Sequence, residues 1–87
     1  MAKIEIYTAM ACPFCTHAVK LLSAKNIDFE EIDVTLSAAT RQAMSNRANG
    51  RTSVPQVFIN NNHIGGCDDL FRFDQTGHLD KLISELT

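Results

Sequence analysis

The stretch "KIEIYTAMACPFCTHAVKLLSAK", residues 3–25, decides how this chain folds. Residues 3–8 alternate between polar and apolar side chains, which predicts a β-strand. Residues 13–25 carry apolar side chains at helical spacing and predict an α-helix. The junction between the two holds a C-x-x-C pair, formed by Cys12 and Cys15. A strand, a short loop with this pair and a helix make up the first half of a βαβ unit, which is a known setting for redox-active cysteines.

The position of the pair points to thiol chemistry. Cys12 is predicted at the N-terminus of the helix, where unpaired N–H groups and the helix dipole stabilise a thiolate. Cys15 lies about one turn further on, close enough to attack a mixed disulfide formed on Cys12. Pro13 suits the first turn, because the N–H that proline lacks has no partner there. The pattern therefore predicts a nucleophilic thiol with a resolving thiol beside it.

Other local patterns predict the elements of the remaining chain. They are strands at 28–34 and 56–60, a short strand ending at Gly65-Gly66, a helix between Ser37 and Asn49-Gly50, a helix from Cys67, and a last helix, after Gly77, with Leu79, Leu82, Ile83 and Leu86 on one face. The order β-α-β-α-β-β-α-α predicts an α/β fold with the first two strands parallel and a hairpin later. The simplest arrangement is a mixed four-stranded sheet with helices on both faces.

The composition is that of a small globular protein. With 87 residues, 45% hydrophobic and 21% charged, we expect residues 1–87 to form a single domain, and a monomer. Lys and Arg are outnumbered by acidic residues and do not cluster, which argues against a nucleic-acid partner. No apolar run approaches the roughly 20 residues that cross a membrane, so no membrane partner is expected.

A metal site is the main alternative for the cysteine pair. Structural zinc needs a second pair of ligands, and the chain offers only Cys67 and the separated histidines His17, His63 and His78. Three cysteines is an odd number, and the N-terminal residues are typical of a strand and not of a signal peptide. We therefore expect a reducing, cytoplasmic location, where a C-x-x-C is more often catalytic or metal-binding than structural.

Three separated motifs resemble those of the glutaredoxin family. They are "CPFC" at 12–15, "SVPQVFI" at 53–59 and "GGCDDL" at 65–70, close to the family patterns CPYC, TVPxVFI and GGCDDL. All three occur in order and at family-like spacing, so the resemblance covers essentially the whole chain. Its similarity to the small dithiol glutaredoxins implies a thioredoxin-like fold. It also implies glutathione as co-substrate, no tightly bound cofactor or metal, and reduction of glutathionylated proteins and protein disulfides.

The resemblance also assigns roles to residues. Cys12 matches the nucleophilic cysteine and Cys15 the resolving one. Val54-Pro55 matches a loop whose proline is cis and whose Val54 backbone pairs with the peptide backbone of glutathione. The other implied glutathione contacts are Phe14, Ser53, Pro55, Gly66, Cys67 and Asp68.

The helix that begins at Cys67 is expected to bind the γ-glutamyl end of glutathione. Its free N–H groups would hold the α-carboxylate, and Asp68 would accept a hydrogen bond from the α-ammonium group. The alternative for Asp68 is a simple cap of the helix, and for Asp69 a cap or a water-facing position is favoured. Cys67 is expected to be a small packing residue and not a third redox centre.

Three positions depart from the family pattern. Ser53 replaces a threonine, which is a mild change. Phe14 stands where tyrosine is commonest, so a hydroxyl is lost while the aromatic wall remains. Ala9 stands where many members have a lysine that helps to hold the thiolate and the glycine carboxylate of glutathione. Arg41 or Gln42 could contact that carboxylate instead, although a solvated helix face is an equal alternative for both.

Two further functions stay open beside the glutathione-dependent oxidoreductase. Some glutaredoxins pair to hold a [2Fe–2S] cluster through the first cysteine and glutathione. Those members usually have glycine or serine after that cysteine, so Pro13 argues against a cluster. A thioredoxin-like protein reduced by a thioredoxin reductase is disfavoured by the GGCDD motif and by the absence of tryptophan near Cys12.

Overall fold

The computed structural model describes residues 3–86, with the side chains of residues 3–84. Its elements follow the order predicted from the sequence. They are β1 (Ile4–Thr8), α1 (Pro13–Ala24), β2 (Glu30–Asp33), α2 (Ala38–Arg47), β3 (Gln56–Ile59), β4 (Asn62–Gly65), α3 (Cys67–Gln75) and α4 (His78–Leu86). The strand predicted at 28–34 spans only Glu30–Asp33. The other elements differ less from their predicted bounds, and only at their ends.

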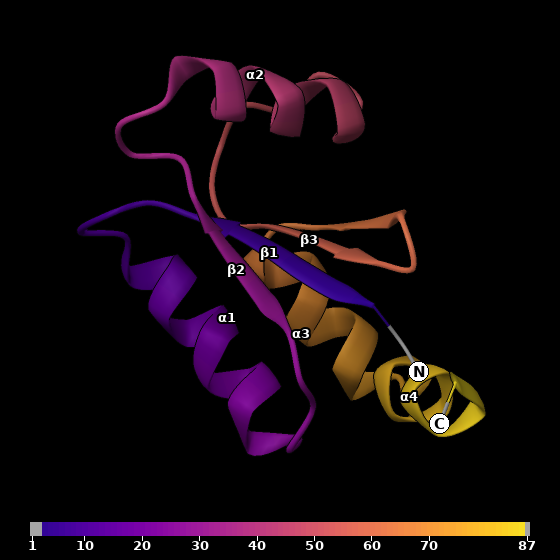
Figure 1. Ribbon diagram of the computed structural model, residues 1–87. Helices are drawn as coiled ribbons and strands as arrows, with labels where there is room; N and C mark the ends of the chain where they lie inside the picture. The colour runs from indigo at the N-terminus through magenta and orange to yellow at the C-terminus, as the bar shows by residue number, and fades with distance from the viewer. Residues whose placement is uncertain (1–2, 87) are drawn as a thin grey trace.

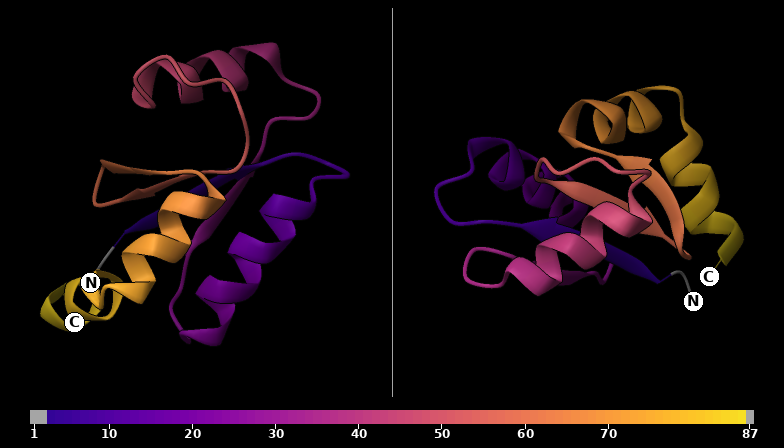
Figure 2. Two further views of the ribbon diagram at one scale, coloured as in Figure 1. Left: turned by 180° about the vertical axis from the view of Figure 1, so that it is seen from behind. Right: turned by 90° about the horizontal axis from the view of Figure 1, so that it is seen from above.

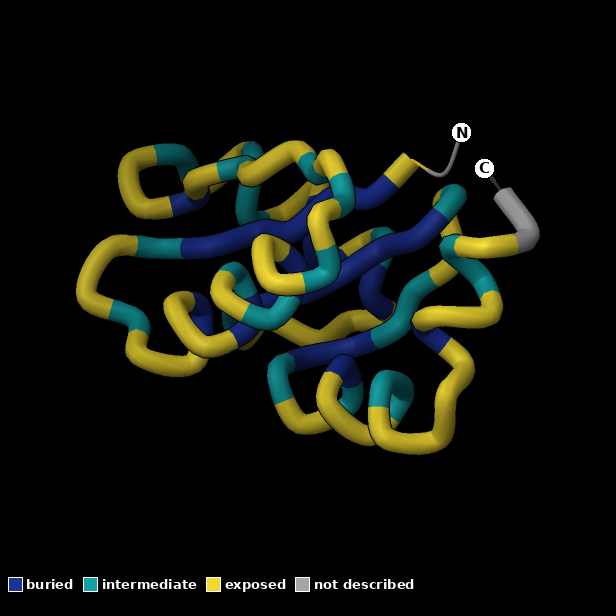
Figure 3. Tube along the Cα trace, turned by 90° about the horizontal axis from the view of Figure 1, so that it is seen from below, coloured by how far each residue is buried: buried dark blue, intermediate teal, exposed yellow. Residues whose placement is uncertain are grey.

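The four strands form one mixed sheet in the order β2-β1-β3-β4. β1 and β2 are parallel because α1 carries the chain back along one face between them, as the sequence predicts. β3 runs antiparallel to both β1 and β4, and β3 and β4 form the expected hairpin. β1 and β3 are therefore the central strands, and every residue in them is buried, as the dark blue runs in Figure 3 show.

Helices cover both faces of this sheet (Figure 1 and Figure 2). α1 and α3 lie against one face with α4 beside them, and α2 lies against the other. The core on the α1 and α3 face consists of Ile4, Ile6, Ala18, Leu22, Val57, Ile59, Leu70 and Leu79. The core on the α2 face consists of Tyr7, Val34, Met44, Ala48 and Phe58. The sheet is therefore covered on both faces, and the loops after β1 and before β3 are attached to its two central strands.

The last helix keeps the face that its periodicity predicts. Leu79 is fully buried, and Leu82 and Ile83 pack against the larger core. The side chain of Leu86, the fourth residue of this pattern, lies outside the described residues.

A partly buried ion pair attaches α2 to β1, one of the two central strands. Glu5 is only 6% exposed, and its carboxylate accepts hydrogen bonds from the Arg47 guanidinium at 2.9 and 3.3 Å. Arg47 also donates to the Tyr7 hydroxyl at 2.8 Å and lies over the Phe58 ring, 4.1 Å from its centre. The Arg47 hydrogen bonds hold the pKa of Glu5 below its ordinary value of 4.5, although burial opposes them.

Glu5→Gln is expected to lower the free energy of unfolding at neutral pH. The difference from the wild type should disappear in acid. When a partly buried charge pair loses one partner, the free energy of unfolding falls by about 1–3 kcal/mol, and exposure of Arg47 to solvent favours the lower end. Because the pKa of Glu5 is lower in the folded state, its contribution is present above the ordinary pKa and disappears as pH falls through the lowered value. Urea unfolding at pH 7 and at pH 3 measures the difference. Asp28→Asn, which removes an exposed carboxylate, should change stability little at either pH.

Candidate functional site

Cys12 is the N-cap residue of α1, with Pro13 in the first turn. Its backbone is extended, and its sulfur accepts a hydrogen bond from the Cys15 backbone N–H, with N and Sγ 3.1 Å apart. This N–H is one of the donors that a helix start leaves unpaired, and the helix dipole adds to its effect. The N-cap position of Cys12 agrees with the sequence prediction, and a helix start of this kind would favour a thiolate on Cys12 in the reduced protein.

The two cysteines are joined by a disulfide bond, with their Cα atoms 5.2 Å apart. They differ in exposure: Cys12 is half-buried, whereas Cys15 is 4% exposed. An external thiol or disulfide can therefore reach Cys12 far more easily than Cys15. This difference suits an outer attacking thiol and an inner resolving thiol.

A groove begins beside Cys12. It has a volume of about 370 Å³, within the range of small-molecule sites, and we name it the proline groove after the proline in its wall. The Cys12 sulfur lies 3.8 Å from the carbonyl oxygen of Val54, which lines this groove. The lining residues are Phe14, Arg51, Ser53, Val54, Pro55, Gly66, Cys67, Asp68, Asp69 and Arg72.

The structure brings together the residues that the resemblance singles out. The lining of the proline groove includes every implied glutathione contact, from Phe14 on α1 through the Ser53–Pro55 loop to Asp68 on α3. The Val54-Pro55 peptide bond is cis, as the resemblance predicts. Phe14 is 61% exposed, so it can form an aromatic wall at the rim. These residues come from three segments far apart in the sequence and meet only in the folded chain.

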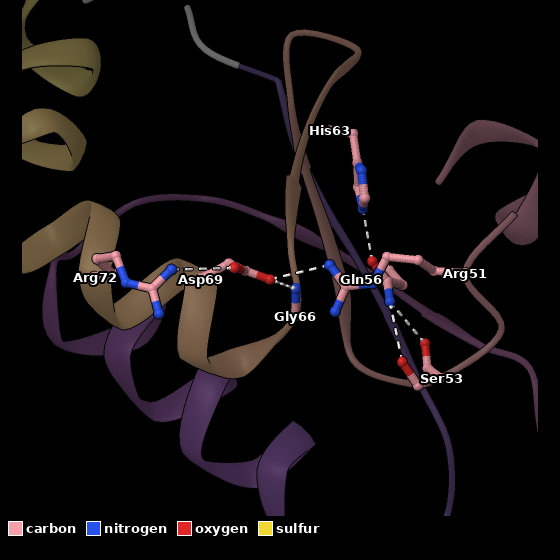
Figure 4. A network of polar contacts seen from close by, with 7 residues as sticks. All are labelled: Arg51, Ser53, Gln56, His63, Gly66, Asp69 and Arg72. Carbon is pink, nitrogen blue, oxygen red and sulfur yellow. Dashed lines mark hydrogen bonds and ion pairs between the residues drawn. The ribbon is translucent and has the colours of Figure 1, made fainter. Parts of the chain in front are cut away.

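The other wall of the groove is held by Asp69. Its carboxylate accepts a hydrogen bond from the Gly66 backbone N–H at 2.9 Å and forms an ion pair with Arg51 at 3.0 Å (Figure 4). Arg72, one turn along α3, lies 3.6 Å from the other carboxylate oxygen. The Gly66 hydrogen bond and then Arg51 hold the pKa of Asp69 below its ordinary value. Asp69 is therefore the cap that the sequence predicts, and it also connects α3 to the segment before the proline.

Sequence reasoning missed the two arginines of the groove. Arg51 and Arg72 line it, whereas Arg41 donates to the Thr52 carbonyl at 3.0 Å and Gln42 to the Asn46 side chain at 3.0 Å. The two α2 residues suggested for the glutathione carboxylate are therefore not among the groove's lining residues. Arg51 lies just before the proline motif, and Arg72 follows Asp69 by three residues. Their closeness to these motifs in the sequence is the one feature that could have indicated a place in the groove.

Cys67 is the one described cysteine outside a disulfide. It is partly buried, packs against the larger core and also lines the proline groove. Burial raises the pKa of the Cys67 thiol, and the charge of Asp68 acts in the same direction. A thiol that stays protonated at neutral pH is a poor nucleophile, which agrees with a packing role.

A second groove adjoins the cysteine pair away from the proline loop. It has a volume of about 570 Å³, and we name it the α1 groove. Its lining residues are Thr8, Ala9, Ala11, Cys12, Pro13, Cys15, Thr16, Val19, Lys20 and Glu31. Cys12 therefore lines the α1 groove and lies beside the proline groove. Cys15 also lines the α1 groove.

Metal binding and membrane insertion are two other classes of function on which the described residues bear. Within residues 3–84, no three His, Cys, Asp or Glu side chains lie together in a way that could hold a metal ion. No helix in the described part of the chain is long and apolar enough to cross a membrane.

Comparison with known proteins identifies the family. A glutaredoxin family model matches residues 4–64. Glutaredoxin 3 of Escherichia coli strain K12 is 51% identical over 83 residues, which cover 95% of this chain and 99% of that protein. The solution structure of a glutaredoxin from Brucella melitensis is 43% identical, with a TM-score of 0.82 over 94% of this chain and 88% of the other.

A crystal structure of a buckwheat glutaredoxin–glutathione complex is also similar. It has a TM-score of 0.86 at 25% identity and covers 97% of this chain and 78% of the other. Members of the family have the thioredoxin-like fold and are thiol–disulfide oxidoreductases with glutathione as co-substrate. The sequence match, the fold and the cysteine pair at disulfide distance agree, and the chain belongs to the glutaredoxin family.

Proposed function

We propose that residues 1–87 act as a single glutaredoxin domain in which Cys12 attacks substrates and Cys15 resolves protein mixed disulfides. The observation that carries this proposal is the setting of the Cys12 sulfur. It is partly exposed, accepts a hydrogen bond from the Cys15 N–H at 3.1 Å and adjoins a groove of about 370 Å³. A thiolate stabilised by a helix start and open to a groove is suited to thiol–disulfide exchange.

With a glutathionylated substrate, the Cys12 thiolate attacks the glutathione sulfur of the mixed disulfide. The substrate sulfur leaves as a thiolate and takes a proton from water, while Cys12 becomes joined to glutathione. The thiolate of a second glutathione then attacks the sulfur of the bound glutathione. Oxidised glutathione leaves, and the Cys12 thiolate is restored. This route does not need Cys15.

With a protein disulfide, Cys12 first forms a mixed disulfide with one sulfur of the substrate. The Cys15 thiolate then attacks the Cys12 sulfur, which releases the reduced substrate and leaves the Cys12–Cys15 disulfide of the structure. The Cys15 sulfur can reach that sulfur directly, because the Cα atoms of the two cysteines are 5.2 Å apart. Two glutathione molecules then reduce the disulfide and leave as oxidised glutathione.

The proline groove is the proposed glutathione site. The Val54 backbone would pair with the peptide backbone of glutathione, beside Phe14 and Ser53. The N-terminus of α3, at Gly66 and Cys67, would face the γ-glutamyl carboxylate. Asp68, which is exposed on the groove, would accept from the γ-glutamyl ammonium group.

Three further properties complete the proposal. The protein acts as a monomer without a tightly bound cofactor or metal, and its partners are glutathione with glutathionylated or disulfide-bonded proteins. It works in the cytoplasm, because glutathione keeps thiols reduced there and the C-x-x-C pair must be reduced to act. Neither a nucleic acid nor a membrane is a partner.

Asp68→Ala tests the glutathione site. A charge-assisted hydrogen bond to the ammonium group, weakened by solvent, predicts a rise of about tenfold in KM for glutathione mixed disulfides. Folding should persist, because the Gly66 N–H is capped by Asp69. Steady-state kinetics with a glutathione mixed disulfide and with a mercaptoethanol mixed disulfide give the comparison, since the second substrate lacks the γ-glutamyl group.

Only the glutathione substrate should be affected by Asp68→Ala. An equal loss with both substrates would mean that Asp68 supports the helix start and not the substrate. Asp28→Ala, which removes a carboxylate outside the groove, is the matched control and should leave both values of KM unchanged.

A further inference from the structure

A hydrogen-bonded chain of side chains leads from β4 to the loop that carries the cis proline. His63 on β4 lies with its Nε2 atom 2.6 Å from Oε1 of Gln56, the first residue of β3. The Gln56 amide nitrogen donates to the carbonyl oxygen of Ser53 at 3.0 Å and to the Ser53 hydroxyl at 3.3 Å. Figure 4 shows the three residues in line, with His63 at the far end from the loop.

The hydrogen-bond chemistry fixes the direction of this chain. A carbonyl oxygen only accepts, so the Ser53 carbonyl requires the NH₂ group of Gln56 on its side. The Gln56 oxygen therefore faces His63, and His63 must carry a hydrogen on Nε2 to donate to it. Burial lowers the pKa of His63 and the nearby Arg51 lowers it further, against the opposing charge of Asp69, which favours the neutral ring.

Both side chains are held firmly. Gln56 is fully buried, so its amide has no water with which to exchange partners. The His63 ring packs against the Phe58 ring with the ring centres 5.1 Å apart. An unpaired polar group on buried Gln56 would be costly, so a single arrangement of the hydrogen bonds between His63, Gln56 and Ser53 is favoured.

The Ser53 carbonyl belongs to the same peptide plane as the Val54 N–H. Among the described residues the cis bond is Val54-Pro55, so the Ser53–Val54 bond is trans, and its C=O and N–H point in opposite directions. When Gln56 holds the Ser53 carbonyl inward, the Val54 N–H is turned outward. Val54 lines the proline groove beside Cys12, where an outward N–H can donate to a bound peptide.

We propose that His63 is a positioning residue for substrate: acting through Gln56, it orients the Ser53–Val54 peptide so that the Val54 N–H faces glutathione. This inference rests on the proposed function, because it needs the proline groove to be the glutathione site. It assigns a role to a histidine that lies outside the groove lining, at the far end of the hairpin strand.

Two substitutions at His63 separate hydrogen bonding from packing. His63→Phe keeps an aromatic ring beside Phe58 but removes the donor to Gln56. His63→Gln places an NH₂ group near the position of Nε2 and restores the donor, so it should rescue what His63→Phe loses. His78→Phe is the matched control, because His78 also stacks on a phenylalanine, Phe73, but outside the proline groove.

The readout is the rate at which the reduced protein reacts, by stopped flow without free glutathione, with two substrates. One is a glutathione mixed disulfide of a short peptide, and the other is the mercaptoethanol mixed disulfide of the same peptide. His63→Phe should slow the glutathione substrate about five- to tenfold, the size expected for one misplaced hydrogen bond, and leave the second rate unchanged. In steady state the loss should appear in KM, with kcat nearly constant.

A spectroscopic measurement tests the first link on its own. Long-range ¹⁵N–¹H spectra of the imidazole rings should show His63 as the neutral Nε2–H tautomer at pH 7. The Nδ1–H tautomer would overturn the inference, because such a ring has no proton to donate to Gln56.

The kinetic outcomes separate the inference from the proposed function. An equal loss with both substrates, or failure of His63→Gln to rescue, would show that His63 only supports the fold and would overturn the inference. An unchanged preference for the glutathione substrate in His63→Phe would overturn it as well. If the wild-type protein itself had no preference for the glutathione substrate, the proposed glutathione site would be wrong instead.

Discussion

Cys12→Ser is expected to abolish thiol–disulfide exchange with every substrate. The Cys12 sulfur is the accessible member of the pair and the one that receives the N–H of the helix start. A serine hydroxyl forms no disulfide and is not ionised at neutral pH, so no mixed disulfide can form. Cys15, at 4% exposure, is too buried to replace it. The remaining rate should equal that of glutathione and substrate without protein.

Cys15→Ser is expected to separate the two proposed routes. Reduction of a glutathione mixed disulfide should survive, because a second glutathione can release the adduct on Cys12. Reduction of a protein disulfide should fall to a small fraction, because the mixed disulfide with the substrate then lacks its internal resolving thiol.

Both variants are measured by NADPH oxidation coupled through glutathione reductase, with a small glutathione mixed disulfide and a disulfide-bonded protein as substrates. Ser23→Ala, on the exposed side near the end of α1, is the control and should behave as the wild type. If Cys15→Ser lost both activities equally, the route that uses Cys12 alone would be refuted.

Gly65→Ala should disrupt the proline groove and lower the stability of the protein. Gly65 has a φ of +125°, which residues with a side chain rarely adopt. A Cβ at this position would lie 2.6 Å from Cγ and 2.7 Å from Cβ of Asp69. The Cβ of Asp69 is fixed to the α3 backbone, so rotating the side chain does not remove the clash and the start of α3 must shift.

Such a shift would break the contacts that hold one wall of the proline groove. The Asp69 bonds to Gly66 and Arg51 would be lost together. Backbone strain, overpacking and these bonds sum to an expected loss of about 3–5 kcal/mol in the free energy of unfolding. For a chain of this size the melting temperature should fall by roughly 15–30 °C. Thermal unfolding followed by circular dichroism measures it.

Gly77→Ala is the matched control. Gly77 also has a positive φ, +82°, but nothing lies within 4 Å of the position its Cβ would occupy. It should show only the backbone strain, about 1–2 kcal/mol. Equal losses in the two variants would mean that backbone strain alone matters and that Asp69 does not block a side chain at residue 65.

Local patterns predicted most of the fold. The element order, the parallel pair around α1, the β3–β4 hairpin and the N-cap position of Cys12 all follow from patterns within a few residues of one another. Element ends follow less closely from local patterns, as the shorter β2 shows, because the last residues of a strand depend on the neighbouring strand and not on their own side chains.

The burial of charged residues was not predictable in the same way. Alternation in β1 assigns Ile4 and Ile6 to the buried face and leaves Glu5 on the other. In the structure both faces of β1 are covered, and Glu5 is buried because Arg47 of α2, 42 residues later in the chain, is its partner. A local pattern holds no information about such a distant partner.

The sequence by itself determined the chemistry of this protein, because its reactive pair lies within one helical turn and the helix start acts on Cys12 through neighbouring backbone. Tertiary structure alone assembled the proline groove. Its walls come from the start of α1, the proline loop and the start of α3, and their spacing is set by the two cores on either side of the sheet. The Asp69–Arg51 pair and the His63–Gln56–Ser53 chain link segments that only packing brings together. Contacts of this kind depend on where whole elements lie, which local propensity does not specify.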